Sequence, residues 1–148
     1  MAVETRIKIW GRKDSTNVQK VLWCCDELGI AYDRTDIGGP FGRNRERPYL
    51  DLNPNGLIPT IEDGDFVLWE SNSIVRYLVD KYGKGSLLPP TPETRGDANR
   101  WMDWQLTTAA PAVQPVFGAY VRNPERKHDP AVLEKALDYA TKAYRMLD

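Results

Sequence analysis

The segment from Leu57 to Ile74, LIPTIEDGDFVLWESNSI, constrains the fold of this chain more than any other. It predicts two short antiparallel strands, PTIED and FVLWE, joined by a tight turn at Asp63-Gly64-Asp65 and followed by a helix that begins at Ser71. The first strand opens with a proline, which cannot donate to a sheet ladder. The second ends with Glu70, a carboxylate where packing seldom needs one. The segment therefore predicts a sheet edge with a use beyond packing.

The residues before this segment predict a β-α-β unit. RIKIW at 6–10 alternates polar and apolar residues as a half-buried strand does, and IAYDRTDI at 30–37 predicts a second strand. Between them, NVQKVLWCCDELG has apolar residues at helical spacing, with Ser15 or Thr16 as N-cap and Gly29 as the C-terminal stop. The two strands are expected to be parallel, with a right-handed crossover.

The connection at 38–56 is rich in Gly, Pro, Asn and Arg, and it predicts a short helix around Arg45–Leu52. The element order is then β-α-β-α-β-β-α. This order predicts a small four-stranded mixed sheet with helices packed on it.

A stretch marked by proline and glycine, KGSLLPPTPETRG at 84–96, indicates a domain boundary. We expect a first domain at 1–84, a linker at 85–96 and a purely helical part at 97–148. Its first helix should bend or end at Pro111 or Pro115. Asp129-Pro130 predicts the start of another helix, whose apolar face comprises Leu133, Ala136, Leu137, Ala140 and Tyr144.

Two long helices do not bury their aromatic residues as a complete bundle. The helical part is therefore expected to be only the beginning of an all-helical domain. Either the sequence is a fragment, or a partner subunit covers the exposed face.

Composition excludes several classes of function. The net charge is −1, with 20 basic and 21 acidic residues interspersed, which gives no footprint for nucleic acid or an anionic membrane. No apolar run approaches the roughly 18 residues of a membrane span, so an intracellular, cytoplasmic protein is expected. Cys24 and Cys25 are adjacent, a poor geometry for a mutual disulfide. With His128 as the single histidine, no metal site is expected.

Three pieces of the chain, in this order and spacing, resemble the glutathione S-transferase family. They are DSTNVQKVLWCCDELGI, NPNGLIPTIEDGDFVLWESNSIVRYL and, in the helical part, RWMDWQ. The resemblance covers essentially residues 6–148 but only the first half of the usual helical domain, so the chain is expected to be incomplete at its C-terminus. It implies a thioredoxin-like N-terminal domain, in a serine-type branch that is bacterial and theta-like or phi-like.

The resemblance implies that the Ile58-Pro59 bond is cis and that the backbone of Ile58 lacks ladder partners. Glutathione is a peptide, so its cysteinyl unit can pair with Ile58 as an added antiparallel strand. A proline that merely ends a sheet edge is the alternative.

Glu70 and Ser71 suit the γ-glutamyl end of glutathione. Its carboxylate fits the N-terminus of the helix at Ser71, and its ammonium fits the Glu70 carboxylate. The alternative is that Ser71 is only an N-cap and that Glu70 only favours the helix dipole.

The resemblance places a thiol-activating hydroxyl at Ser15, in the turn before the first helix. Thr16 and Asn17 compete for this role, because some branches use a threonine or an asparagine there, and Ser15 as a simple N-cap is the remaining alternative. Leu57 stands where several branches place a Lys or Gln. Arg43, Arg45 or Arg47 could bind the glycyl carboxylate. There is no C-x-x-C motif, so Cys25 is expected in the core and Cys24 to be incidental.

The resulting hypothesis is a homodimeric detoxification enzyme with glutathione as co-substrate, which directs the glutathione thiolate at a hydrophobic electrophile. Two alternatives remain. One is glutathione-dependent reduction of peroxides or disulfides, and the other is a non-catalytic interaction module on the same fold.

Overall fold

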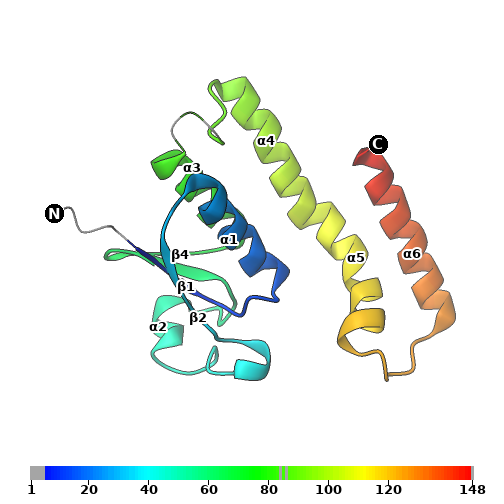
Figure 1. The fold of residues 1–148 in the computed structure, drawn as a ribbon. Helices are drawn as coiled ribbons and strands as arrows, with labels where there is room; N and C mark the ends of the chain where they lie inside the picture. Colours follow the sequence, from blue (N-terminus) through cyan, green and yellow to red (C-terminus); the bar gives the residue numbers. More distant parts are fainter. Residues whose placement is uncertain (1–5, 84, 86, 148) are drawn as a thin grey trace. The chain divides into compact units, whose positions relative to one another are not determined.

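The computed structural model describes residues 6–83, 85 and 87–147. The chain divides into two compact units, Met1–Pro89 and Pro90–Asp148, and we treat each by itself (Figure 1). The first unit contains the sheet, and the second is helical.

The first unit has one sheet of four strands in the order β2-β1-β3-β4. β1 (Ile7–Trp10) pairs in parallel with β2 (Tyr32–Thr35) and antiparallel with β3 (Thr60–Asp63). The hairpin is completed by β4 (Phe66–Trp69), which runs antiparallel to β3. The mixed four-stranded sheet predicted from the sequence is confirmed.

Two helices pack on one face of this sheet (Figure 1): α1 (Thr16–Leu28) and α3 (Ser71–Tyr82). The buried cluster consists of isoleucines from the strands and apolar residues of the two helices, namely Ile7, Ile9, Ile61, Val21, Cys24, Cys25, Ile74 and Leu78. α1 ends at Gly29, whose φ of 65° is the left-handed conformation predicted for this C-cap.

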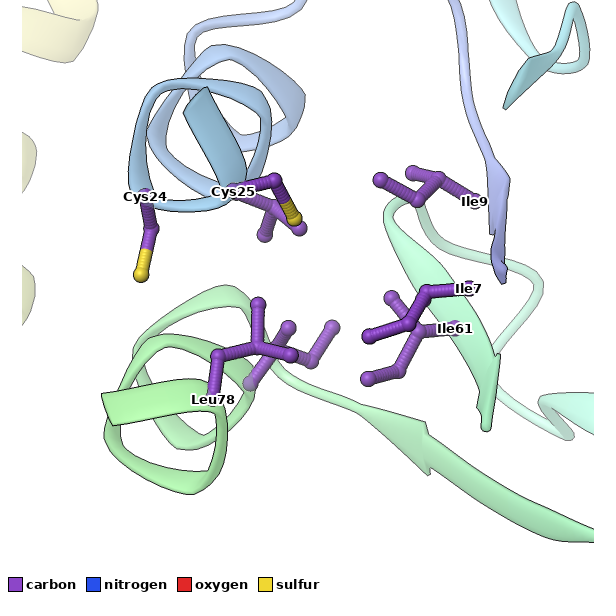
Figure 2. Close-up of a cluster of buried hydrophobic side chains, with 8 residues drawn as sticks. Ile7, Ile9, Cys24, Cys25, Ile61 and Leu78 are labelled. Atoms are coloured by element: carbon purple, nitrogen blue, oxygen red, sulfur yellow. The ribbon is translucent and has the colours of Figure 1, made fainter. Parts of the chain in front are cut away.

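The thiol groups of both cysteines belong to this core. Figure 2 shows Cys25 directed toward the isoleucines of the sheet and Cys24 toward α3. Cys25 is fully buried, and Cys24 is 6% exposed. The expectation that Cys24 is incidental was wrong, because α1 contacts the sheet on one side and α3 on the other, so two adjacent helix positions are covered.

The connection between β2 and β3 contains a short 3₁₀ turn, η1 (Gly39–Phe41), and the single-turn helix α2 (Tyr49–Leu52). The predicted helix around Arg45–Leu52 is therefore shorter than expected, because Pro48 disfavours helical backbone at the residue before it and the helix begins only at Tyr49. β3 begins at Thr60, one residue after Pro59, and Glu70 lies beyond the end of β4.

In the second unit, helical backbone runs without interruption from Pro92 to Arg122. It consists of α4 (Pro92–Trp104), the π-helical segment η2 (Gln105–Ala109), α5 (Ala110–Phe117) and a second π-helical segment, η3 (Gly118–Arg122). The helix ends at neither Pro111 nor Pro115. Both prolines lie within α5. The π-helical segment η2 ends at Ala109, so the hydrogen-bonding pattern of the helix changes just before Pro111.

The last helix, α6 (Pro130–Tyr144), packs against α5 and is followed by the 3₁₀ turn η4 (Arg145–Leu147). Its N-cap is Asp129, whose Oδ1 accepts a hydrogen bond from the amide of Ala131 at 2.9 Å, as predicted. The predicted apolar face is only partly correct. Leu133, Ala136 and Ala140 are half-buried, but Leu137 and Tyr144 are 43% and 47% exposed, whereas the neighbouring Ala143 is buried.

Aromatic residues of the second unit gather where α4 ends. Trp104 meets Trp101 and Tyr144 edge to face, at centroid distances of 5.5 and 6.4 Å. With Arg100 and Met146, the two tryptophans line an open hollow of about 330 Å³. In the part of the chain that the structure describes, every helix is too short or too polar to cross a bilayer.

Candidate functional site

The loop before β3 presents unpaired backbone at the end of the sheet. The Ile58-Pro59 peptide bond is cis, Pro59 is buried, and the adjacent Leu57 side chain is 55% exposed. Within residues 6–83, no backbone hydrogen bond involves the N–H or C=O of Ile58. These two groups are available to an extended peptide.

The turn that leads into α1 lies against this loop. A Cβ atom added at Gly11 would lie 3.4 Å from the Cβ of Ile58, so the end of β1 and the Ile58 loop are in direct contact. From there the chain turns, and the amide of Ser15 donates to the carbonyl of Arg12 at 3.3 Å. The structure thus brings the turn at 11–15 to the same end of the sheet as Ile58.

Ser15 occupies the N-cap position of α1, but its side chain makes no capping hydrogen bond. A serine at an N-cap usually accepts a bond from the second or third helical amide. Ser15 is half-buried, and its hydroxyl has no hydrogen-bond partner among the described residues, so it can donate to a ligand. Thr16 and Asn17 are exposed in the first turn of α1, and the structure does not choose between the three side chains.

A second helix N-terminus lies at Glu70 and Ser71. Ser71 is the first residue of α3, as predicted, and is 8% exposed. The N-cap of α3 is Glu70. The alternative interpretation of Ser71 as a simple N-cap is therefore wrong. Glu70 is exposed and has a φ of 72°, a left-handed conformation that is uncommon for a residue with a side chain. Such strained positions are frequent at binding sites.

The N-terminus of α3 combines opposite charges. The first bond of the helix runs from the amide of Ile74 to the carbonyl of Glu70, so the positive end of the helix dipole lies at Ser71. This end attracts an anion, while the exposed Glu70 carboxylate attracts a cation. An amino acid zwitterion carries both charges on one carbon.

α1 and α3 are joined beside these residues. Lys20 Nζ donates to Oδ1 of the buried Asn72 at 2.8 Å. Burial lowers the pKa of Lys20, and the negative charge of Glu70 partly offsets this effect. The Lys20 ammonium is therefore close enough to the Glu70 carboxylate to interact with it. Lys20 and Asn72 were not predicted as site residues, since nothing local in the sequence marks two residues 52 positions apart as partners.

The three arginines proposed for the glycyl carboxylate each have a partner elsewhere. Arg43 donates to the Asp36 carbonyl, Arg45 Nη1 donates to the Asn55 carbonyl at 2.9 Å, and Arg47 pairs with Asp51 at 2.8 Å.

Arg12 directly follows Gly11, which contacts Ile58, and it was not predicted from the sequence as a site residue. Its side chain packs against Gly39, where an added Cβ would lie 2.6 Å from Arg12 Nε. Its Nη1 pairs with Asp14 at 2.9 Å, and this hydrogen bond is the main cause of the lowered pKa of Asp14. Arg12 Nε is buried without a hydrogen-bond partner among the described residues.

Neither cysteine is placed for chemistry at this site. Burial raises the pKa of Cys24 to about 11 and that of Cys25 to about 12. At neutral pH both are thiols within the core, and a thiolate is needed for nucleophilic attack. The described residues contain no group of three or more His, Cys, Asp or Glu side chains that could hold a metal ion.

Fold and site together define the class of this protein: a thioredoxin-like domain with an open cis-proline edge between two helix N-termini, followed by a helical unit. Comparison with known proteins agrees. Residues 14–81 match the family model described as "Glutathione S-transferase, N-terminal domain".

Individual relatives extend the match over almost the whole chain. "Glutathione S-transferase GstB" of Escherichia coli strain K12 is 39% identical over 144 residues, which cover 96% of this chain and 69% of that protein. The theta class glutathione S-transferase from Xanthomonas axonopodis pv. citri, crystallised with glutathione bound, is 45% identical with a TM-score of 0.89, over 95% of this chain and 67% of that one. The glutathione transferase URE2P6 from Phanerochaete chrysosporium, in complex with oxidized glutathione, is 29% identical with a TM-score of 0.84, over 99% and 68%.

The chain thus spans about two thirds of the length of these three proteins. It belongs to the glutathione S-transferase family.

Proposed function

We propose that this protein is a glutathione transferase of the serine type. It binds glutathione along the Ile58-Pro59 edge and stabilises its thiolate. The sulfur then forms a bond to an electrophilic carbon of a hydrophobic co-substrate while the leaving group departs. No covalent intermediate with the protein is required.

The observation that carries this proposal is the unpaired backbone of Ile58, which lies beside the turn that ends at Ser15. The cysteinyl unit of glutathione would pair with the Ile58 N–H and C=O as an added strand. Its γ-glutamyl carboxylate would accept hydrogen bonds at the N-terminus of α3, beginning with Ser71, and its ammonium would pair with Glu70. Both ends of this zwitterion then meet a complementary group.

Ser15 would stabilise the glutathione thiolate, and Thr16 and Asn17 are the other candidates for this role. A free thiol has a pKa of about 8.5 and is mostly protonated at neutral pH. Lowering this pKa by about two units requires roughly 2.7 kcal/mol of preference for the anion. One hydroxyl hydrogen bond to the sulfur, together with the N-terminus of α1, is of this size.

Glu70→Gln tests the proposal, because it keeps the shape of the side chain and removes its charge. We expect the wild-type protein to be retained on immobilised glutathione and the variant to elute early. Asp65→Asn is the matched control, since Asp65 is an exposed carboxylate in the neighbouring hairpin turn. Failure of the wild-type protein to bind glutathione would overturn the proposal.

Turnover separates the alternatives. A transferase converts a chlorinated aromatic compound, whereas a peroxidase or reductase converts an organic hydroperoxide or a mixed disulfide, and an interaction module converts none. We further propose that the protein is a homodimer and acts in the cytoplasm. Sedimentation analysis and cell fractionation test these two statements.

A further inference from the structure

The loop at 55–57 is held by side chains from the preceding segment at 44–53. Each of its three consecutive carbonyl groups accepts at least one hydrogen bond from that segment. The donors are Arg45 Nη1 to Asn55 (2.9 Å), Asn44 Nδ2 to Gly56 (2.7 Å), and both the Tyr49 hydroxyl and Asn53 Nδ2 (2.9 Å) to Leu57. The next carbonyl along the chain, that of Ile58, has no such donor among the described residues. Side chains therefore hold the carbonyl groups up to Leu57, and the Ile58 backbone that is proposed to pair with glutathione is the first one left open.

The Leu57 carbonyl is connected to the sheet through a buried network. Tyr49, Asn53 and Thr60 are 2%, 2% and 0% exposed. The Tyr49 hydroxyl lies 2.8 Å from Thr60 Oγ1, and Asn53 Nδ2 donates to the same oxygen at 3.2 Å. Thr60 is the first residue of β3 and pairs with Trp10 and Trp69, so it is fixed by strands on both sides.

The protons in this network balance. The Tyr49 proton goes to the Leu57 carbonyl, and the Thr60 hydroxyl donates to the Tyr49 oxygen. The two protons of the Asn53 amide are divided between the Leu57 carbonyl and the Thr60 hydroxyl. Every donor has an acceptor, and a fully satisfied buried network is rigid.

We propose that Tyr49, Asn53 and Thr60 are positioning residues that hold the Leu57 carbonyl inward and thereby keep the Ile58 backbone turned outward for the peptide. This inference rests on the proposed function. A loop that had to be ordered by its ligand would lose affinity to conformational entropy, and a loop ordered in advance avoids this loss. The network therefore acts on glutathione binding and not on the chemistry at sulfur.

Tyr49→Phe is the sharpest test, because it deletes one hydroxyl and keeps the ring that lies 6.2 Å from the ring of Trp10. The hydroxyl's two neutral hydrogen bonds, to the Leu57 carbonyl and to Thr60, are lost. We expect the Kd and KM for glutathione to rise about tenfold, while kcat at saturating glutathione and the pKa of the bound thiol stay unchanged. Amide exchange at Ile58 should become faster in the free protein.

Tyr82→Phe is the matched control. Its hydroxyl also donates within a part-buried network, at 2.8 Å to Asp63, at the other end of β3. This variant should lose stability but keep its affinity for glutathione. A rise in Kd that is equal in the two variants, or an unchanged Kd in Tyr49→Phe, would overturn the positioning role alone. If the wild-type protein does not bind glutathione, the proposed function fails and this inference fails with it.

Discussion

Lys20 Nζ donates a hydrogen bond of 2.8 Å to Oδ1 of Asn72, and this bond joins the second turn of α1 to the first turn of α3. Asn72 directly follows Ser71 and Glu70, and Lys20 lies just over one helical turn beyond Ser15. The bond therefore couples the segment proposed to bind the γ-glutamyl group with the segment proposed to activate the thiol.

Replacing Lys20 with methionine removes the ammonium and keeps an apolar stem of similar length. We expect glutathione binding to weaken about three- to tenfold, because Glu70 and Ser71 lose a fixed position relative to α1. Titration calorimetry measures the change. Lys8→Met is the control, since Lys8 is exposed and its ammonium lies 4.0 Å from the Glu62 carboxylate, a loose contact. A lower melting temperature with unchanged affinity would reduce the Lys20 bond to a purely structural role.

Ser15→Ala should return the pKa of bound glutathione toward that of the free thiol. A rise of about two units would lower kcat/KM roughly a hundredfold below pH 7. The ultraviolet absorbance of the thiolate, followed against pH, reports the pKa directly. Thr16→Val and Asn17→Ala belong in the same series. If either of them raises the pKa and Ser15→Ala does not, that residue is the activating group.

Stability should fall in acid because of Asp63. This buried carboxylate accepts hydrogen bonds from Tyr77, Lys81 and Tyr82 at 2.7–2.8 Å. Burial alone would raise the pKa of Asp63, but these three donors hold it below its ordinary value of 3.8. A carboxyl whose pKa is lower in the folded state stabilises the fold above pH 3.8. This contribution is lost as the pH falls through the folded pKa.

Asp63→Asn should lower the free energy of unfolding at pH 7 by about 2–3 kcal/mol, the scale of hydrogen bonds to a charged group. Its stability should also change less between pH 5 and pH 2 than that of the wild type. Urea unfolding at several pH values measures both effects. If the free energy of unfolding of the two proteins depended on pH in the same way, Asp63 would not be the cause of the acid sensitivity.

Cys24 and Cys25 should resist thiol reagents in the folded protein. Burial raises their pKa to about 11 and about 12, so very little thiolate exists at pH 8, and the side chains are covered. A disulfide reagent should react with both only after denaturation. Rapid reaction of either thiol under native conditions would show that the core opens between α1 and α3.

Gly11→Ala should destabilise the fold and loosen the Ile58 loop. Gly11 has a φ of 153°, and an added Cβ would lie 2.5 Å from Val18 Cγ2. We expect a loss of about 1–3 kcal/mol, as for other overpacked sites. Gly118→Ala is the control, because nothing lies within 4 Å of its added Cβ and its φ is helical at −60°. That variant should be neutral or slightly more stable, and thermal unfolding distinguishes the two.

The sequence by itself determined the elements whose signals are local. The alternation in RIKIW, the helical spacing before Gly29 and the Asp-Gly-Asp turn each depend on residues that are close along the chain, and the structure has these elements where they were predicted. The order of these elements was sufficient to predict the mixed sheet. The motif around Pro59 and Glu70 likewise marked the loop and the helix start, because an X-Pro step and a strand-to-helix junction are local features.

Only the tertiary structure decided which distant side chains became partners. It placed Cys24 in the core because α3 covers a second side of α1, and it left Leu137 and Tyr144 of the helical unit exposed. It also made Glu70 the N-cap of α3. The tertiary structure likewise decided the pairings of Lys20 with Asn72 and of Tyr49 with Leu57. The strength of a hydrogen bond depends on the distance between two atoms in space and on their burial, and neither quantity exists until the chain has folded.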